Sequence, residues 1–361
     1  IRDAAEGAYD RTDACTFTSF VAYEWSGGPN GNMTHRNVIF ADERAPDLPV
    51  SYIDEPTGEG LWRSLDAACS NPGCRYMTIP HNTNLSNGML FTSEVASAED
   101  ARRRRELEPL LEIIQHKGDS ECRAGEADEF CSFEKLPFSR MEEQPFRARW
   151  REPAIGLTFA RDILGQGLVR EAKVGDNPFR FGMIGATDTH LGAAGLVDER
   201  DYPGHGAGGD TSRVEVPTVP DSVYFNPGGL AGVWAEENSR ESIWAALRRR
   251  EVYATSGPRI VVRFFGGFDY AGKQPVFNVL ALQDAGTAAS PGTPLDRVQI
   301  VKVWLEDGKV HEKVFNVARS ASLVAVEDVD ISECAPATNG SATLCAQWRD
   351  EEWDAAKSSL Y

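Results

Sequence analysis

The chain has 361 residues, with 37 Lys and Arg against 55 Asp and Glu and a formal net charge of −18. A hydrophobic fraction of 41% is typical of a globular protein and excludes a disordered or collagen-like chain. The length suits about two domains. The acidic balance argues against nucleic acid or an anionic membrane surface as the main partner. No apolar run approaches the roughly 20 residues that a transmembrane segment needs.

Strand and helix patterns alternate through the first 250 residues. The β-branched and aromatic run 16–25 predicts a buried strand, and the apolar spacing over 59–69 predicts a helix. Further strands are predicted over 38–40, 75–80, 110–115 and 179–186, and further helices over 98–107, 154–168 and 241–250. The arginine run Arg102–Arg105 is interpreted as a solvated helix face. This alternation predicts an α/β sheet or barrel.

The pattern changes after Ser256-Gly257-Pro258. Short β-rich runs follow, separated by Gly, Asp and Pro, at 259–265, 276–281, 299–306, 310–317 and 321–326. None of the intervening stretches carries a helical period of useful length. The sequence therefore predicts two domains, an α/β domain over residues 1–255 and a β-rich, sandwich-like module over residues 256–361.

Six of the seven cysteines lie in three close pairs, Cys69 with Cys74, Cys122 with Cys131, and Cys334 with Cys345. Loop-forming residues separate the members of each pair, which predicts three disulfide bonds and a periplasmic or secreted protein. Free thiols in a cytosolic enzyme are the alternative. A structural zinc site is disfavoured because no C-x₂-C spacing occurs. Cys15 has no neighbouring cysteine, and we expect its partner in a segment outside this chain.

Metal-competent side chains follow four of the predicted strands. Glu24 closes the first, His81 and His116 follow two others, and Asp188 with His190 follows the strand at 179–186. The carboxyl ends of parallel strands form one rim, so these residues are expected to converge there. A single histidine is more often a structural hydrogen-bonding residue. Four such strand ends in a chain with six histidines nevertheless favour a metal site.

Asp188 and His190 are separated by one residue. On an extended segment, side chains two positions apart point to the same side. We therefore expect both to reach one metal cluster. The alternative is that Asp188 caps its segment and His190 only forms a hydrogen bond. His35, in a loop before the strand at 38–40, is left open as a ligand, a substrate contact or a structural residue.

Seven sequence blocks in this order resemble the signature blocks of the DUF3604 family, which is itself similar to the PHP (polymerase and histidinol phosphatase) metal-dependent phosphoesterases. The blocks are Phe20–Trp25, Thr34–Phe40, Ile79–Asn82, Gln115–Glu121, Ile184–His190, Asn226–Trp234 and Tyr253–Arg259. The resemblance implies a PHP-like distorted (β/α)₇ barrel that binds two or three divalent metal ions, either zinc, manganese or iron. A PHP-like site opens with an H-x-H pair, which this sequence does not contain. The resemblance therefore places the strand that carries it upstream of Ile1.

The resemblance also implies roles for single residues. Glu24 would be the bridging carboxylate, His81 and His116 the next ligands, and Asp188 with His190 the closing pair. Glu24, His81 and Asp188 are expected to be catalytic as well. A hydroxide bridging the metals would attack a small-molecule ester.

Apart from the resemblance, a further set of residues is expected to contact the substrate. Arg36, Lys117 and Arg259 are candidates to bind an anionic group, with a purely structural role as the alternative for each. Asn82 and Asn84 would orient groups beside His81, and His35 is a candidate substrate contact.

The resulting hypothesis is a metal-dependent hydrolase, in the first place a phosphoesterase. Two alternatives stay open: a metallo-hydrolase of an amide, a lactone or another ester on the same scaffold, and a non-catalytic binding protein with a vestigial metal site. A dehydrogenase, a P-loop protein and a serine hydrolase are disfavoured. Their motifs, G-x-G-x-x-G after a strand, G-x-x-x-x-G-K-[ST] and G-x-S-x-G, are absent from the sequence.

Overall fold

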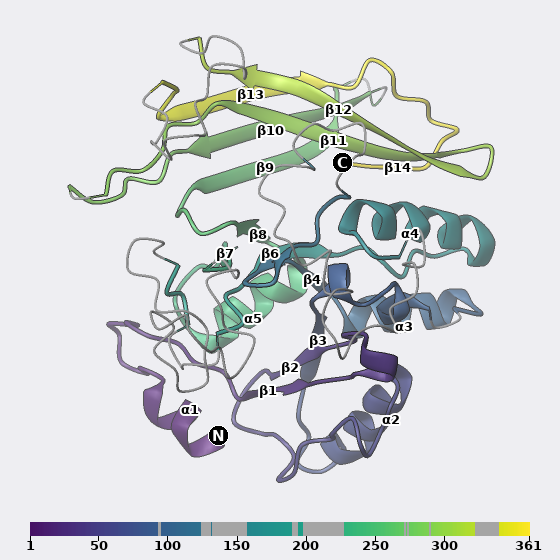
Figure 1. Cartoon of the computed structure of the whole chain (residues 1–361), viewed down its shortest axis with the longest axis vertical. Helices are drawn as coiled ribbons and strands as arrows, with labels where there is room; N and C mark the ends of the chain where they lie inside the picture. The colour runs from purple at the N-terminus through teal and green to yellow at the C-terminus, as the bar shows by residue number, and fades with distance from the viewer. Residues whose placement is uncertain are drawn as a thin grey trace, which may run out of the picture. The chain divides into compact units, whose positions relative to one another are not determined.

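A computed structural model describes residues 1–92, 95–123, 131, 157–189, 194–197, 227–270, 272, 274–288, 290–321 and 339–361 (Figure 1). The chain divides into two compact units, which we call the N-terminal unit, Ile1–Ser256, and the C-terminal unit, Gly257–Tyr361.

Two three-stranded sheets and a hairpin form the N-terminal unit. In the first sheet β2 (Arg36–Phe40) lies between β1 (Ala22–Trp25) and β3 (Tyr76–Pro80) and is antiparallel to both. In the second sheet β4 (Leu110–Gln115) lies between β5 (Gly118–Asp119) and β6 (Gly182–Gly185), and it runs parallel to β6. The hairpin pairs β7 (Leu230–Val233) with β8 (Val252–Thr255). Because β3 contacts β4 and β6 contacts β8, the three pieces adjoin one another.

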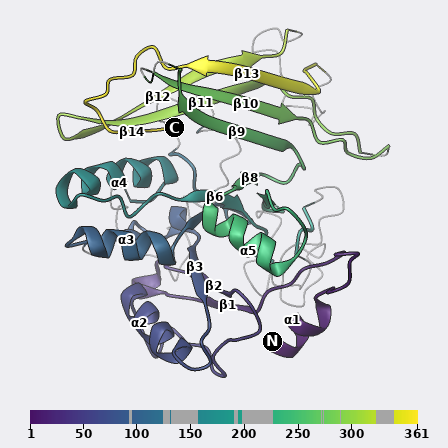
Figure 2. The same ribbon diagram turned by 180° about the vertical axis from the view of Figure 1, so that it is seen from behind.

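Five α-helices are described, all in the N-terminal unit: α1 (Arg2–Ala8), α2 (Gly58–Cys69), α3 (Ala98–Leu107), α4 (Ala160–Val174) and α5 (Arg240–Arg249). Thr57, Ser97 and Ser239 cap α2, α3 and α5, each accepting a hydrogen bond from a backbone N–H of the first turn. Helix α2 buries Leu61 and Leu65 within the core of the first sheet. Helices α3 and α4 lie side by side in both views (Figures 1 and 2).

The predicted (β/α)₇ barrel is wrong. The described strands form small and mostly antiparallel sheets, with β4–β6 as the one parallel pair among them and no closed barrel. Ten residues, 26–35, join β1 to β2. A parallel crossover needs about a dozen residues or more, so this connection can only return the chain antiparallel. Alternation of strands and helices in the sequence did not distinguish this arrangement from a barrel.

Part of the arginine run is buried, which corrects the solvated face expected for Arg102–Arg105. Arg104 is 3% exposed and shares the fully buried Glu108 with Arg36. Two guanidinium groups around one carboxylate satisfy charges that would otherwise be costly inside a core. The trio fixes the start of β2 against the end of α3.

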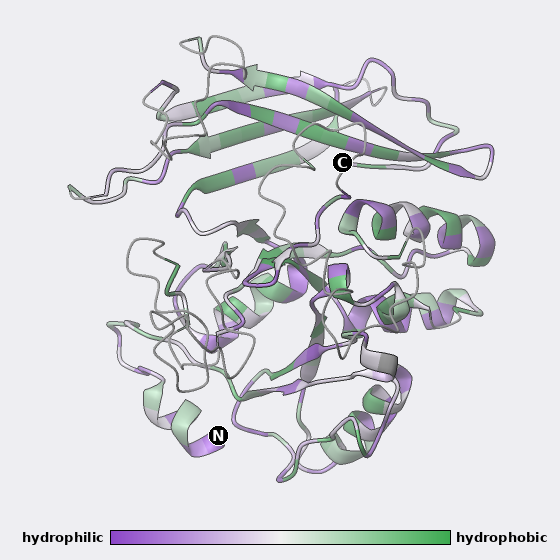
Figure 3. Ribbon diagram, in the orientation of Figure 1, coloured by the Kyte–Doolittle hydropathy of each residue, from purple (hydrophilic) through white to green (hydrophobic). Residues whose placement is uncertain are grey.

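Strands alone make up the described part of the C-terminal unit. One antiparallel sheet has the order β13 (Thr343–Arg349), β10 (Pro275–Leu282), β9 (Val261–Phe268). The other has the order β12 (Lys309–Arg319), β11 (Arg297–Glu306), β14 (Ser359–Leu360). Phe315 of β12 packs on Trp348 of β13 at 4.8 Å between ring centroids, which joins the two sheets. Hydrophobic residues predominate along β9 and β10 (Figure 3). Of the predicted run 321–326, all but Ala321 lies outside the described residues.

Two of the predicted disulfide bonds, Cys69–Cys74 and Cys122–Cys131, are confirmed. They indicate an oxidising, extracellular environment. The third predicted bond involves Cys334, which lies outside the described residues, while Cys345 is exposed on β13. In the described part of the chain, no helix has the length and apolar character to cross a membrane.

Candidate metal centre

Glu24, His35 and His81 form a compact group of ligand atoms. One atom from each side chain lies within 4.8 Å of the others. His35 Nδ1 is 2.7 Å from Glu24 Oε1, and His81 Nε2 is 3.5 Å from the same oxygen. Burial by itself would raise the pKa of Glu24. The interactions with His35 and His81 outweigh it and hold that pKa well below its usual range, so the carboxyl is ionised.

Strand direction explains why these three residues meet. Because β1 and β3 are both antiparallel to β2, they run in the same direction and end where β2 begins. Glu24 lies near the end of β1, His81 follows β3, and His35 precedes β2. The backbone N–H of His81 donates to the carbonyl oxygen of His35 at 3.3 Å, which fixes the two histidines beside each other. His35 therefore belongs to this group of potential ligands, a position that the sequence left open.

The group suits a cation. His81 is 1% exposed, and neither of its ring nitrogens has a hydrogen-bond partner among the residues that the structure describes. Buried polar atoms in native proteins are almost always satisfied. An imidazole with the 3.5 Å contact to Glu24 but no hydrogen bond to the described residues is therefore suited to bind a ligand. Two imidazoles and one carboxylate are a common zinc ligand set. The residues present thus fit the metal that the family resemblance implies.

A second group follows the parallel pair of strands. His116 comes after β4 and Asp188 after β6, and His116 Nε2 is 3.0 Å from Asp188 Oδ2. Lys117 Nζ lies 2.7 Å from His116 Nε2 and also contacts Asp188 Oδ2. Burial would raise the pKa of Asp188, but its contact with His116 and the charge of Lys117 hold that pKa well below its usual range. Here a lysine ammonium is the neighbour of both potential ligands.

Asn82 and Gln115 connect the two groups. The Gln115 amide donates to Asn82 Oδ1 and, at 3.0 Å, to Asp188 Oδ2. Asn82 directly follows His81 and adopts a left-handed backbone conformation with φ of 58°. Asp188 does the same with φ of 53°, so the extended segment expected at Asp188 is wrong. Such conformations at non-glycine residues cluster at functional sites.

Glu112 is the residue at this centre that sequence reasoning missed. It lies within β4, is 2% exposed, and its Oε1 has no hydrogen-bond partner in the described part of the chain. Burial raises its pKa to about 7, against the opposing effect of His81. A charged residue inside the apolar run Leu110–Ile114 was the available signal, because carboxylates are almost never buried without a partner.

The other predicted residues have different surroundings. Arg36 is 3% exposed and donates to Glu108 and to the carbonyl oxygens of Thr34 and Leu90. Its guanidinium group therefore has a structural role in the core. Arg259 is exposed in the C-terminal unit, where its backbone N–H donates to Asp284. His190 lies outside the described residues.

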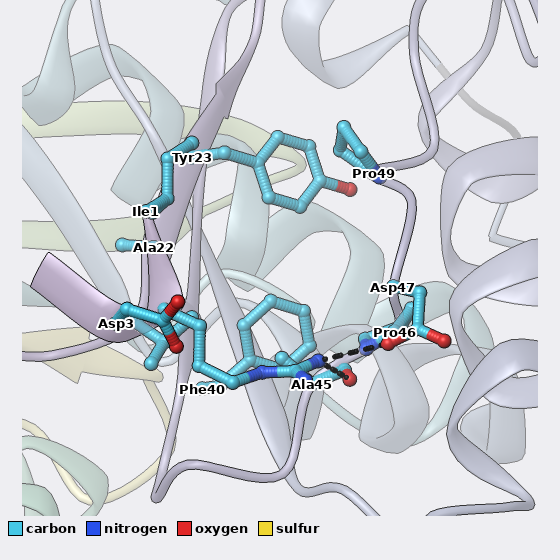
Figure 4. Close-up of a pocket in the computed structure, with 11 residues that line it drawn as sticks. Ile1, Asp3, Ala22, Tyr23, Phe40, Ala45, Pro46, Asp47 and Pro49 are labelled. Carbon is cyan, nitrogen blue, oxygen red and sulfur yellow. Dashed lines mark hydrogen bonds and ion pairs between the residues drawn. The ribbon is translucent and has the colours of Figure 1, made fainter. Parts of the chain in front are cut away.

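A separate cavity of about 340 Å³ lies beside β1 (Figure 4). Tyr23 lines it, and successive side chains of a strand point to opposite faces, so Tyr23 and Glu24 face apart. Arg2 closes one side by donating to the carbonyl oxygen of Ala45. None of the predicted site residues lines this cavity.

These features define a two-unit protein with a partly buried group of two histidines and a carboxylate, spaced as potential metal ligands. The chain belongs to the DUF3604 family, described as "Protein of unknown function (DUF3604)", whose model matches residues 1–274 and 270–361. No curated protein and no solved structure matches the sequence.

Proposed function

We propose that the protein is a metal-dependent hydrolase, in the first place a phosphoesterase, with two or three divalent cations such as zinc, manganese or iron. The observation that carries the proposal is the group of Glu24, His35 and His81, whose ligand atoms lie within 4.8 Å of one another. The buried His81 has no hydrogen-bond partner among the described residues, so it supports a ligand role better than a structural one.

The two groups would divide the cations between them. Glu24, His35 and His81 would hold one, and His116 with Asp188 would hold another. Bound cations supply Lewis-acid charge for an ester oxygen and lower the pKa of an attacking water. Glu24 is kept ionised by its histidine neighbours, as a metal ligand must be. Gln115 holds Asn82 and Asp188 in place through its amide.

The proposal extends to chemistry of the PHP-like type. The ligand types that the resemblance implies, a carboxylate followed by histidines and an aspartate, are those gathered here. The support comes from the ligands and not from the fold, because no barrel is present among the described strands. The active chemistry of a site depends on its residues more than on its scaffold.

Metal content and turnover measured together test the proposal. The full chain is stripped with a chelator, reloaded with zinc or manganese, and assayed on chromogenic phosphate, sulfate and carboxylate esters. We expect bound metal and phosphate release in the wild type, and loss of both in Glu24→Gln and His81→Asn. The exposed Glu43 and His311 provide matched controls, Glu43→Gln and His311→Asn, which should behave as wild type.

Two results would refute parts of the proposal. A wild-type protein without bound metal, or full metal content in both Glu24→Gln and His81→Asn, would eliminate the metal centre. Hydrolysis of sulfate or carboxylate esters alone would keep the metal centre and replace the phosphoesterase assignment.

A further inference from the structure

Lys117 places a positive charge between two potential metal ligands. Its Nζ is 2.7 Å from His116 Nε2 and contacts Asp188 Oδ2, and those two atoms are 3.0 Å apart. An imidazole nitrogen and a carboxylate oxygen that converge on one small cation are the arrangement of a metal site. In the structure that cation is an ammonium group.

Resting on the proposed function, we propose that Lys117 acts as an internal counter-cation, whose ammonium group occupies the His116–Asp188 position until a divalent metal displaces it. An ammonium and a metal ion cannot share this position, since both need the same lone pairs and their charges repel. Metal binding at His116 and Asp188 is therefore an exchange of one cation for another.

The backbone at Lys117 is fixed by hydrogen bonds, whereas the ammonium stands at the end of a long, flexible side chain. The Lys117 N–H donates to Gln115 Oε1 at 2.6 Å, and its carbonyl oxygen accepts from Asn84 Nδ2 at 3.1 Å. Gly118 follows with φ of 96°, a conformation that favours glycine and turns the chain into β5. Four methylene groups separate this anchored backbone from the ammonium, so the ammonium can leave without disturbing β4.

The other group of ligands differs in this respect. Among the described residues, Glu24 forms ion pairs with His35 and His81 and with no lysine or arginine. A metal bound there displaces no lysine or arginine of the described residues. The centre should therefore load in two steps, first at Glu24, His35 and His81, and then at His116 and Asp188 as Lys117 leaves.

Removing the lysine should strengthen the second step alone. Apparent affinity falls in proportion to the fraction of molecules whose site is vacant, so a lysine in place about 90% of the time weakens binding about tenfold. We expect titration of the chelated full chain with zinc to show two steps, and Lys117→Met to tighten the weaker step by about tenfold. Lys117→Arg, which keeps a cation, should stay close to wild type. The exposed Lys173 on α4 gives the matched control Lys173→Met, which should equal wild type.

Wild-type protein offers a readout that needs no substitution. Acylation of lysines followed by peptide mass spectrometry should show Lys117 protected in chelated protein and several-fold more reactive once zinc is added. Two bound metals with an unchanged or weaker second step in Lys117→Met would overturn the inference and leave the proposed function standing. Equal Lys117 reactivity with and without zinc would overturn it as well. No metal bound to the wild type would instead remove the proposed function.

Discussion

The C-terminal unit contains a buried lysine–aspartate pair and the N-terminal unit a partly buried one, and the surroundings of the two pairs differ. In the C-terminal unit Asp350 is fully buried and contacts Lys302, which is 6% exposed. Asp350 also accepts hydrogen bonds from the backbone N–H of Glu352 at 3.0 Å and from the Tyr361 hydroxyl. The ammonium of Lys302 lies 5.5 Å from the ring centre of Trp304. Every charge in this pair is neutralised by protein groups.

The pair of Lys117 and Asp188 stands beside unsatisfied groups instead. His81 and Glu112 carry buried polar atoms without hydrogen-bond partners among the described residues. An unsatisfied buried group destabilises a fold, and proteins retain such groups where function needs them. A buried ion pair therefore does not by itself mark a functional site. Whether the neighbouring buried polar groups have hydrogen-bond partners distinguishes a structural pair from one whose cation can be exchanged.

The largest expected effect on activity comes from breaking the pair in the N-terminal unit. Asp188→Asn removes an anionic ligand while conserving size, and it should lower hydrolysis at least about a hundredfold if the metal supplies several kcal/mol of transition-state stabilisation. Bound metal should fall in parallel by elemental analysis. Asp13→Asn, at an exposed position, is the control. Normal metal content and rate in Asp188→Asn would make Asp188 a structural residue like Asp350.

Breaking the other pair should affect stability and spare the metal. Asp350→Ala leaves Lys302 buried without its carboxylate, which should cost about 3–5 kcal/mol of unfolding free energy. The double variant Lys302→Met with Asp350→Leu should recover most of that loss, because two apolar groups need no partner. Urea unfolding of the full chain measures both. A loss below about 1 kcal/mol in Asp350→Ala would mean that water satisfies Lys302, and the contrast between the pairs would disappear.

The pH dependence of stability should reveal the unsatisfied carboxyl. Burial raises the pKa of Glu112 to about 7 from an ordinary 4.5, so the folded metal-free protein binds this proton more tightly than the unfolded chain. This contribution is fully present below about pH 4.5 and is lost as the pH rises to about 7. Glu112→Gln stays neutral, so its unfolding free energy relative to wild type should rise over this range by on the order of 3 kcal/mol.

Other groups titrate in the same range, so the difference between variant and wild type is the quantity to follow. His81, whose pKa is raised against the effect of burial by Glu24 and other carboxylates, titrates in both proteins. A difference that stays constant from pH 4.5 to pH 7 would show that Glu112 is ionised and has a partner.

The smallest expected effect concerns the displaced lysine. Once metal has released Lys117, its ammonium is available to an anionic substrate group, as the sequence suggested. Inorganic phosphate should bind the zinc-loaded Lys117→Met variant about tenfold more weakly than wild type, the loss expected for one charge-assisted hydrogen bond. Calorimetry with phosphate measures this. Equal phosphate affinity in the two proteins would show that Lys117 does not bind phosphate in the metal-loaded protein, so that its role would be limited to the metal-free state.

Strand ends bring predicted residues together for different reasons in the two sheets. His116 and Asp188 meet because β4 and β6 are parallel, as the argument assumed. Glu24 and His81 meet although their sheet is antiparallel, because β1 and β3 flank the same antiparallel strand. That arrangement also adds His35 from the start of β2. No periodicity in the sequence states which strands pair or in which direction.

Local features were determined by the sequence itself. The helix at 98–107 and the strand at 110–115 have the bounds that were predicted, and two disulfide bonds close short loops between neighbouring cysteines. Hydrophobic periodicity, helix-capping residues and the length of the loop between two cysteines act within a few residues, so their effects can be predicted from the local sequence. The tertiary structure decided the direction of strand pairing, the burial of Glu112 and the position of Lys117 between His116 and Asp188. These depend on contacts between residues far apart in sequence, where packing and electrostatics choose among arrangements that the local pattern allows equally.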